Sequence, residues 1–168
     1  TSLLDYIRKA GVALKEAGGI TQSVGAYEVL HNKQRITFID TPGHEAFSKM
    51  RARGASIADM AILVIAATDG VQKQTKEAIK ILKATETPFI VAINKIDQAG
   101  GDVDKIKNQL TQEGVLLEGY GGDISWHGVS AKTGEGINDL LDLIILLSDV
   151  EGLDYEENKN ASGYILES

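Results

Sequence analysis

Short apolar runs alternate with helical segments along this sequence, and that alternation limits the possible folds more than any other feature. Residues 60–67 are apolar without a break, which is typical of a parallel strand buried on both faces. Apolar spacing and turn signals predict the other elements. Strands are expected over 26–30, 35–39, 89–93 and 126–129, and helices over 2–14, 45–53, 72–85, 103–112 and 137–149. The order predicts an α/β fold, a mostly parallel sheet with helices on both faces and one antiparallel edge hairpin.

The chain has the length and composition of one globular domain with a core, since 43% of its 168 residues are hydrophobic. We expect this domain to occupy residues 1–150. Residues 151–160 are acidic and polar, which is typical of a solvated linker, and residues 163–166 then begin a strand. Residues 151–168 are therefore expected to hold a linker and the start of a second domain.

Composition excludes several classes of function. No apolar run approaches the roughly 20 residues that a membrane span needs, so no membrane partner is expected. The chain has no cysteine, which excludes disulfides and thiolate metal sites and fits a cytoplasmic protein. Its net charge of -7 opposes broad, sequence-independent binding of nucleic acid, because that affinity comes from Lys and Arg. Any contact with nucleic acid should be local.

Polar residues suited to chemistry follow three of the expected strands, at the point where each strand ends. They are Asp-Thr-Pro-Gly-His at 40–44, Asn-Lys-Ile-Asp at 94–97 and Ser-Ala-Lys at 130–132. Because the carboxyl ends of parallel strands meet at one rim of a sheet, we expect these segments to lie close together. At the first of them, the Asp40 carboxylate can face a hydrated cation, and Gly43 lets backbone N–H groups approach a phosphate.

The second and third segments carry groups that match the edge of a guanine base. The carboxylate of Asp97 can accept two hydrogen bonds from adjacent N–H and NH₂ donors, which guanine presents and adenine does not. The Asn94 amide can bridge to the base or brace the neighbouring loop, and the Lys95 stem can lie along the base plane. The amide of Ala131 would complete recognition of the carbonyl. Because a buried unpaired acceptor costs roughly 1–3 kcal/mol, we expect strong rejection of the wrong base.

Taken alone, Asn94 and Asp97 could instead form a helix cap. The ordered set of segments favours base recognition, because it resembles the third, fourth and fifth signatures of the P-loop GTPases. His44, the last residue of the first segment, narrows the resemblance to translational GTPases. Residues 18–27 and 47–54 closely resemble the GTP-binding domains of the bacterial-type translation initiation factor 2 family. The resemblance implies the P-loop GTPase fold and a β-barrel domain that starts within 151–168.

The resemblance also assigns a role to each matching residue. It implies that Asp40 holds Mg²⁺ through water, that Thr1 binds Mg²⁺ directly, and that Thr21 closes on Mg²⁺ and the γ-phosphate. Gly43 would donate its amide to the γ-phosphate, and His44 would orient the attacking water as the catalytic residue. The residues implied to bind GTP or GDP are Thr1, Ser2, Thr21, Asp40, Gly43, Asn94, Lys95, Asp97, Ser130, Ala131 and Lys132.

The activity and partners implied are those of a switch in protein synthesis. The protein would hydrolyse GTP to GDP and phosphate, slowly until the ribosome contacts the switch regions and His44. Initiator tRNA would bind through domains outside this chain, and we expect a monomer in the cytoplasm.

One departure from the family pattern concerns the phosphate-binding loop. The motif G-x-x-x-x-G-K-[ST] should end immediately before Ser2, and only its last residue, Thr1, is present. The first strand of the fold is absent as well. We therefore expect this sequence to be an N-terminally incomplete part of a longer chain, and inactivity of the isolated part stays open. Two alternatives stay open: another translational GTPase, or a non-hydrolysing nucleotide-binding or interaction module that lacks the phosphate loop.

Overall fold

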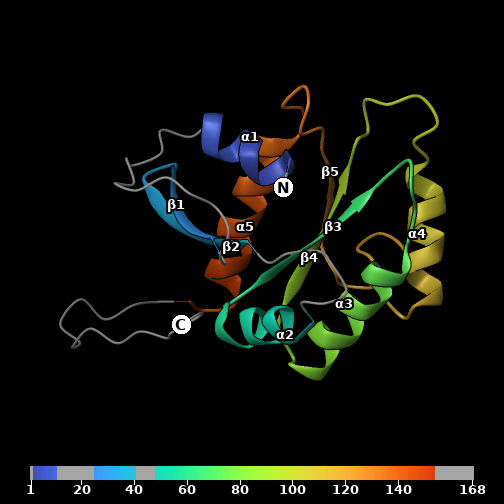
Figure 1. Cartoon of the computed structure of the whole chain (residues 1–168), viewed down its shortest axis with the longest axis horizontal. Helices are drawn as coiled ribbons and strands as arrows, with labels where there is room; N and C mark the ends of the chain where they lie inside the picture. The colour runs from blue at the N-terminus through green and yellow to red at the C-terminus, as the bar shows by residue number, and fades with distance from the viewer. Residues whose placement is uncertain (1, 11–24, 41–47, 154–168) are drawn as a thin grey trace.

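The computed structural model describes residues 2–10, 25–40 and 48–153 (Figure 1). Strands and helices alternate along this part of the chain, as the sequence predicts for an α/β fold. The strands are β1 (Gly25–His31), β2 (Gln34–Asp40), β3 (Ala61–Ala66), β4 (Phe89–Asn94) and β5 (Trp126–Gly128). The helices are α1 (Ser2–Ala10), α2 (Ser48–Ile57), α3 (Lys73–Ala84), α4 (Val103–Gln112) and α5 (Ile137–Val150).

A parallel sheet of β3, β4 and β5, in that order, forms the centre of the fold. The central strand β4 is completely buried from Ile90 to Ile93. Because successive side chains of a strand point to opposite faces, this burial means that both faces of the sheet are covered. The apolar run 60–67 itself forms β3, where Leu63 and Ile65 are buried but Val64 is 46% exposed, so the prediction of burial on both faces holds for β4 and is wrong for β3.

Helices cover the two faces in two groups (Figure 1). On one face, Ile90 and Ala92 of β4 share a buried cluster with residues of α1 and α5. On the other face, Val91 and Ile93 share a second cluster with residues of α3 and α4, and α2 packs against its rim. The prediction of helices on both faces is confirmed.

The hairpin of β1 and β2 turns through Asn32 and Lys33, whose φ angles of 48° and 67° are typical of a two-residue type I′ turn. Among the described residues it forms a two-stranded sheet of its own, and not the edge of the parallel sheet. Its buried residues Val29 and Phe38 belong to the cluster of α1 and α5. In the described part of the chain, side-chain packing joins the hairpin to the core, together with hydrogen bonds from His31 and Asn32 to Asp142 of α5.

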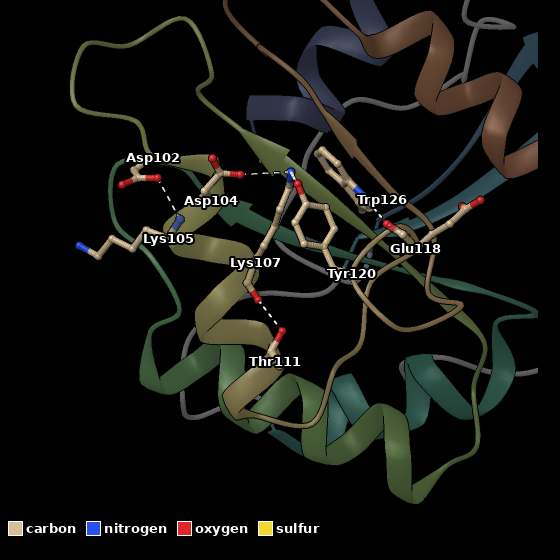
Figure 2. Close-up of polar contacts among 8 residues, drawn as sticks. All are labelled: Asp102, Asp104, Lys105, Lys107, Thr111, Glu118, Tyr120 and Trp126. Atoms are coloured by element: carbon tan, nitrogen blue, oxygen red, sulfur yellow. Dashed lines mark hydrogen bonds and ion pairs between the residues drawn. The ribbon is translucent and has the colours of Figure 1, made fainter.

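Helix α4 is tied to the segment before β5 by a buried lysine (Figure 2). The Lys107 side chain is only 8% exposed, and its Nζ lies 4.3 Å from the ring centre of Tyr120 and 4.0 Å from that of Trp126. The ammonium also donates to Tyr120 Oη at 2.7 Å and lies 3.4 Å from Asp104 Oδ1. Two aromatic faces and two oxygens thus replace the water that this charge loses on burial.

Helix α2 differs from its predicted range. It continues to Ile57, four residues beyond the expected end at Arg53. Gly54 is buried, and the carbonyl of Ala55 accepts a hydrogen bond from Thr87 Oγ1 at 2.8 Å. Tertiary contacts therefore extend the helix past a glycine that weakens helices in isolation. Within the described ranges, no helix has the length and apolar character needed to cross a membrane.

Candidate functional site

The loops that follow β4 and β5 lie side by side at one rim of the sheet. Val129 N donates to Ile93 O at 2.8 Å, and Ile96 N donates to Val129 O at 3.3 Å. These bonds continue the pairing of the two strands past their ends. The structure thus brings segments 94–97 and 130–132 together, as the sequence predicts.

Asn94 is the centre of this rim. Its side chain is buried, and Oδ1 accepts hydrogen bonds from Lys95 N at 2.7 Å and from Ala131 N at 3.0 Å. Its backbone carbonyl accepts a bond from Ala67 N at 2.8 Å, just beyond β3. The oxygen of this amide thus braces the neighbouring loops, and its contact with a base stays a prediction.

A hydrogen bond between Ser130 and Asp97 links the two loops directly. Ser130 is completely buried, and its Oγ donates to Asp97 Oδ1 at 2.7 Å. The same Oγ accepts a bond from Thr133 N at 3.1 Å. Asp97 itself is exposed, and a carboxylate offers about four acceptor positions. The carboxylate is therefore fixed on its protein side while it keeps acceptor capacity toward a ligand.

The amide of Ala131 has a partner that the sequence did not predict. It was expected to meet the carbonyl of a base, and here it donates to Asn94 Oδ1. A base carbonyl would have to share this N–H, as a three-centre bond, or displace the Asn94 oxygen. Lys132 follows in the same loop with an exposed side chain.

The loop of residues 130–136 is closed by its own backbone. Gly134 N donates to Ser130 O at 2.8 Å, and Ser130 N donates to Glu135 O at 2.9 Å. Gly134 has a φ of +87° and Gly136 has a φ of +70°. Glycine adopts these angles readily and other residues do not, so both glycines are needed for this shape of the loop.

Lys95 has a left-handed backbone, with φ at 65°, and its ammonium faces a residue of the neighbouring strand end. Lys95 Nζ lies 3.4 Å from Asp69 Oδ2. The Asp69 carboxylate also accepts a bond from Thr68 Oγ1 at 2.8 Å. The Thr68 hydrogen bond, followed by the bond and charge of Lys95, holds the pKa of Asp69 below its usual value.

Sequence reasoning missed Thr68 and Asp69. The signal was available, because both directly follow the apolar run 60–67, as the predicted site residues follow their own strands. The exposed carboxylate can steer the Lys95 stem, which was predicted to lie along a base.

The remaining predicted residues fall outside this cluster or outside the described part of the chain. Asp40 is the last residue of β2 and pairs with Gly25 across the hairpin. Ser2 is the exposed first residue of α1. A carboxylate oxygen such as that of Asp40 is the kind of donor that Mg²⁺ takes. The predictions that lie outside the described residues are Thr1, Thr21, Gly43 and His44.

Residues 10–149 match the family model described as the elongation factor Tu GTP binding domain. The match spans the hairpin, the parallel sheet, helices α2 to α4 and all of α5 except Val150. It thus includes every residue of the cluster at the ends of β4 and β5.

Curated relatives are similar over the whole chain. The chain is 54% identical to "Translation initiation factor IF-2" of Alkaliphilus metalliredigens and 55% identical to that of Francisella philomiragia, each over 168 residues. It spans only 24% and 20% of the lengths of these relatives.

Solved structures share the fold. GDP-bound aIF5B from Aeropyrum pernix gives a TM-score of 0.71 at 35% identity, over 94% of this chain and 35% of the other. The elongation factor SelB from Methanococcus maripaludis, in complex with the GTP analogue GPPNHP, gives a TM-score of 0.68 at 28% identity, over 88% of this chain and 30% of the other.

Proposed function

Since the chain belongs to the elongation factor Tu GTP binding domain family, we propose that it binds GTP and GDP through the loops after β4 and β5. We propose further that it is the switch domain of a translation initiation factor and hydrolyses GTP to GDP and phosphate. The sequence relatives, at 54–55% identity, favour initiation over another step of translation.

The observation that carries the proposal is the cluster of Asn94, Asp97, Ser130 and Ala131. An exposed carboxylate held by a buried hydroxyl is a rigid acceptor for the adjacent N–H and NH₂ groups of guanine. Adenine offers a different edge, so an adenine nucleotide would leave this acceptor unpaired. Preorganised groups of this kind lose little entropy when the ligand binds.

Hydrolysis would depend on residues at the first strand end and in the preceding loop. In the proposed mechanism, His44 orients the attacking water, while Gly43 donates its amide to the γ-phosphate and Thr21 closes over it. Bound Mg²⁺ would offset the charge of the phosphates, and Asp40 and Thr1, with Thr21, are the residues proposed to hold it. Phosphoryl transfer needs mainly positioning and charge stabilisation, so a partner can raise the rate by completing the site.

The proposed partner is the ribosome, which would contact the switch regions and His44. Release of the γ-phosphate would free Thr21 and Gly43 and so change the surface offered to the ribosome. Initiator tRNA would bind to other domains, and the protein would act as a cytoplasmic monomer. The division into a GTP-binding domain over 1–150 and a linker with the start of a β-barrel over 151–168 stays a prediction.

Nucleotide competition tests this function. Fluorescent GDP bound to the full-length protein carrying this sequence should be displaced by unlabelled GDP at concentrations at least about 100-fold lower than by ADP, given the cost of unpaired polar groups. In parallel, His44→Ala should lower ribosome-stimulated hydrolysis and leave GDP affinity unchanged. Equal displacement by GDP and ADP would contradict the proposal.

A further inference from the structure

Tyr6 of α1 lies directly against Gly134, within the loop of residues 130–136. A methyl group added to Gly134 would lie 1.9 Å from Tyr6 Oη and 2.6 Å from Tyr6 Cζ. Both distances are far below any contact that a real methyl group makes. The phenol therefore covers the backbone of this loop with no space for a side chain between them.

The packing of α1 fixes Tyr6 in this place. Leu3 and Ile7 are 3% and 1% exposed and anchor the helix in the core that it shares with α5. At about 100° of rotation per residue, Tyr6 lies on one flank of this buried stripe and Leu4 lies on the other. Tyr6 and Ala131 both pack against the same core. A rigid helix thus presents the phenol to the loop.

The contact falls on the residue that closes the loop. Gly134 N donates to Ser130 O at 2.8 Å, and its φ of +87° sets the direction of the chain. Ser130 and Ala131 precede it in the same tight turn. A displacement of Gly134 would therefore move the buried hydroxyl and the amide that belong to the candidate site.

We propose that Tyr6 is a positioning residue for base recognition, holding loop 130–136 so that the Ala131 amide can meet the 6-carbonyl of guanine. This inference rests on the proposed function. Tyr6 need not touch the nucleotide, because its effect passes through Gly134. It also makes α1 a mechanical link to the base-reading loop, so that a shift of this helix would alter the base contact.

Two analogues separate the contact made by the loop from the contact made by Asp97. In 6-thio-GDP the carbonyl oxygen is replaced by sulfur, a weaker acceptor, while the N–H and NH₂ donors remain. In inosine diphosphate the carbonyl remains and the NH₂ donor is absent. Selectivity against the first therefore reports on the Ala131 amide, and selectivity against the second reports on Asp97.

The variants are Tyr6→Ala, Tyr6→Phe and the matched control Leu4→Ala, made in the full-length protein. For Tyr6→Ala we expect GDP affinity to fall about two- to tenfold, roughly the value of one hydrogen bond, and the preference for GDP over 6-thio-GDP to fall with it. The preference for GDP over inosine diphosphate should change less, because Asp97 lies on the other loop and is held to this one through the Ser130 hydroxyl. Tyr6→Phe keeps the aromatic ring against the loop and should retain most of the GDP affinity and selectivity that Tyr6→Ala loses. Leu4→Ala should leave both preferences as they are in the wild type.

The reciprocal variant changes the other side of the contact. Gly134→Ala forces a methyl group into Tyr6 and also strains φ. Gly121→Ala is a matched control for the strain alone, because Gly121 has a φ of +86° and open space around its Cβ position. We expect Gly134→Ala to lower the preference for GDP over 6-thio-GDP, and we expect Gly121→Ala to leave this preference unchanged. Adding Tyr6→Ala to Gly134→Ala should restore part of the loss.

Hydrogen exchange distinguishes a failure of this inference from a failure of the proposed function. In nucleotide-free protein, the amides of Ala131 and Gly134 should exchange about tenfold faster in Tyr6→Ala than in Leu4→Ala, which corresponds to about 1.4 kcal/mol of lost protection. Wild-type protein that binds GDP and ADP equally would refute the proposed function, and the exchange rates would still decide whether Tyr6 holds the loop. Unchanged exchange, or equal loss of affinity for every nucleotide tested, would overturn the inference.

Discussion

The buried hydroxyl of Ser130 donates to the exposed carboxylate of Asp97 at 2.7 Å, across 33 residues of sequence. This bond joins the loops after β4 and β5, and it orients the group proposed to select guanine. Because Ser130 is completely buried and Asp97 is not, the hydroxyl can act only on the protein side of the carboxylate.

Ser130→Ala should destabilise the fold by about 1–3 kcal/mol, because it leaves Thr133 N without its buried acceptor and removes the bond to Asp97. Urea denaturation measures the change, and GDP affinity should fall in the same variant. Ser148→Ala is the matched control, since Ser148 Oγ bonds only to Ile145 O within α5 among the contacts of the described residues. Equal effects of the two substitutions would refute a special role for Ser130.

Lys107→Met should destabilise the fold by about 1–2 kcal/mol through the loss of its aromatic contacts and its bond to Tyr120. Trp126, the one tryptophan of the sequence, reports unfolding by its fluorescence. Lys105→Met, on the exposed side of the same helix, is the control and should change stability by less than about 0.5 kcal/mol. A Lys107→Met variant as stable as the wild type would show that the buried ammonium does not stabilise the fold.

The pKa of Asp69 should lie below its usual value when it is measured by NMR titration, and it should rise both in Thr68→Val, which removes a hydrogen bond, and in Lys95→Met, which removes a hydrogen bond and a charge. Because the folded pKa is depressed, the carboxylate contributes to stability above its unfolded pKa near 3.8. That contribution is lost as pH falls through the folded value. In Asp69→Asn, the free energy of unfolding should therefore fall less steeply as the pH drops below about 4. An ordinary pKa in the wild-type chain would contradict this account.

Much of the fold could be predicted from the sequence, because periodicity alone locates elements that are buried on one or two faces. The strand expected over 89–93 is β4 (Phe89–Asn94), and the helix expected over 103–112 is α4 (Val103–Gln112). The predicted end of α2 was wrong, because the burial of Gly54 and the hydrogen bond from Thr87 depend on tertiary packing. The separate sheet of the hairpin could not be predicted either, because periodicity gives strands and not their pairing.

The site was predictable in its location and not in its internal bonds. Strand ends gave the positions of Asn94, Asp97 and Ser130, because the carboxyl ends of parallel strands share a rim. The bond between Asn94 and Ala131 depends on the side-chain conformation of a buried amide, which no local pattern specifies. The contact of Tyr6 with Gly134 joins two segments far apart in sequence, so the tyrosine looked like any other residue on a helix flank.

The most direct test of guanine recognition is the nucleotide selectivity of Asp97→Asn. An asparagine side chain offers one acceptor and an NH₂ donor, so it should lose the paired bonds to guanine and donate from its NH₂ group to the 2-carbonyl of xanthine instead. The full-length protein and the variant are titrated with fluorescent GDP and with unlabelled GDP, xanthosine diphosphate and ADP as competitors. We predict that GDP affinity falls about 10- to 100-fold in the variant, as expected for hydrogen bonds to a charged group, while xanthosine diphosphate binds more tightly than to the wild type. Unchanged preference for GDP in Asp97→Asn would contradict the account.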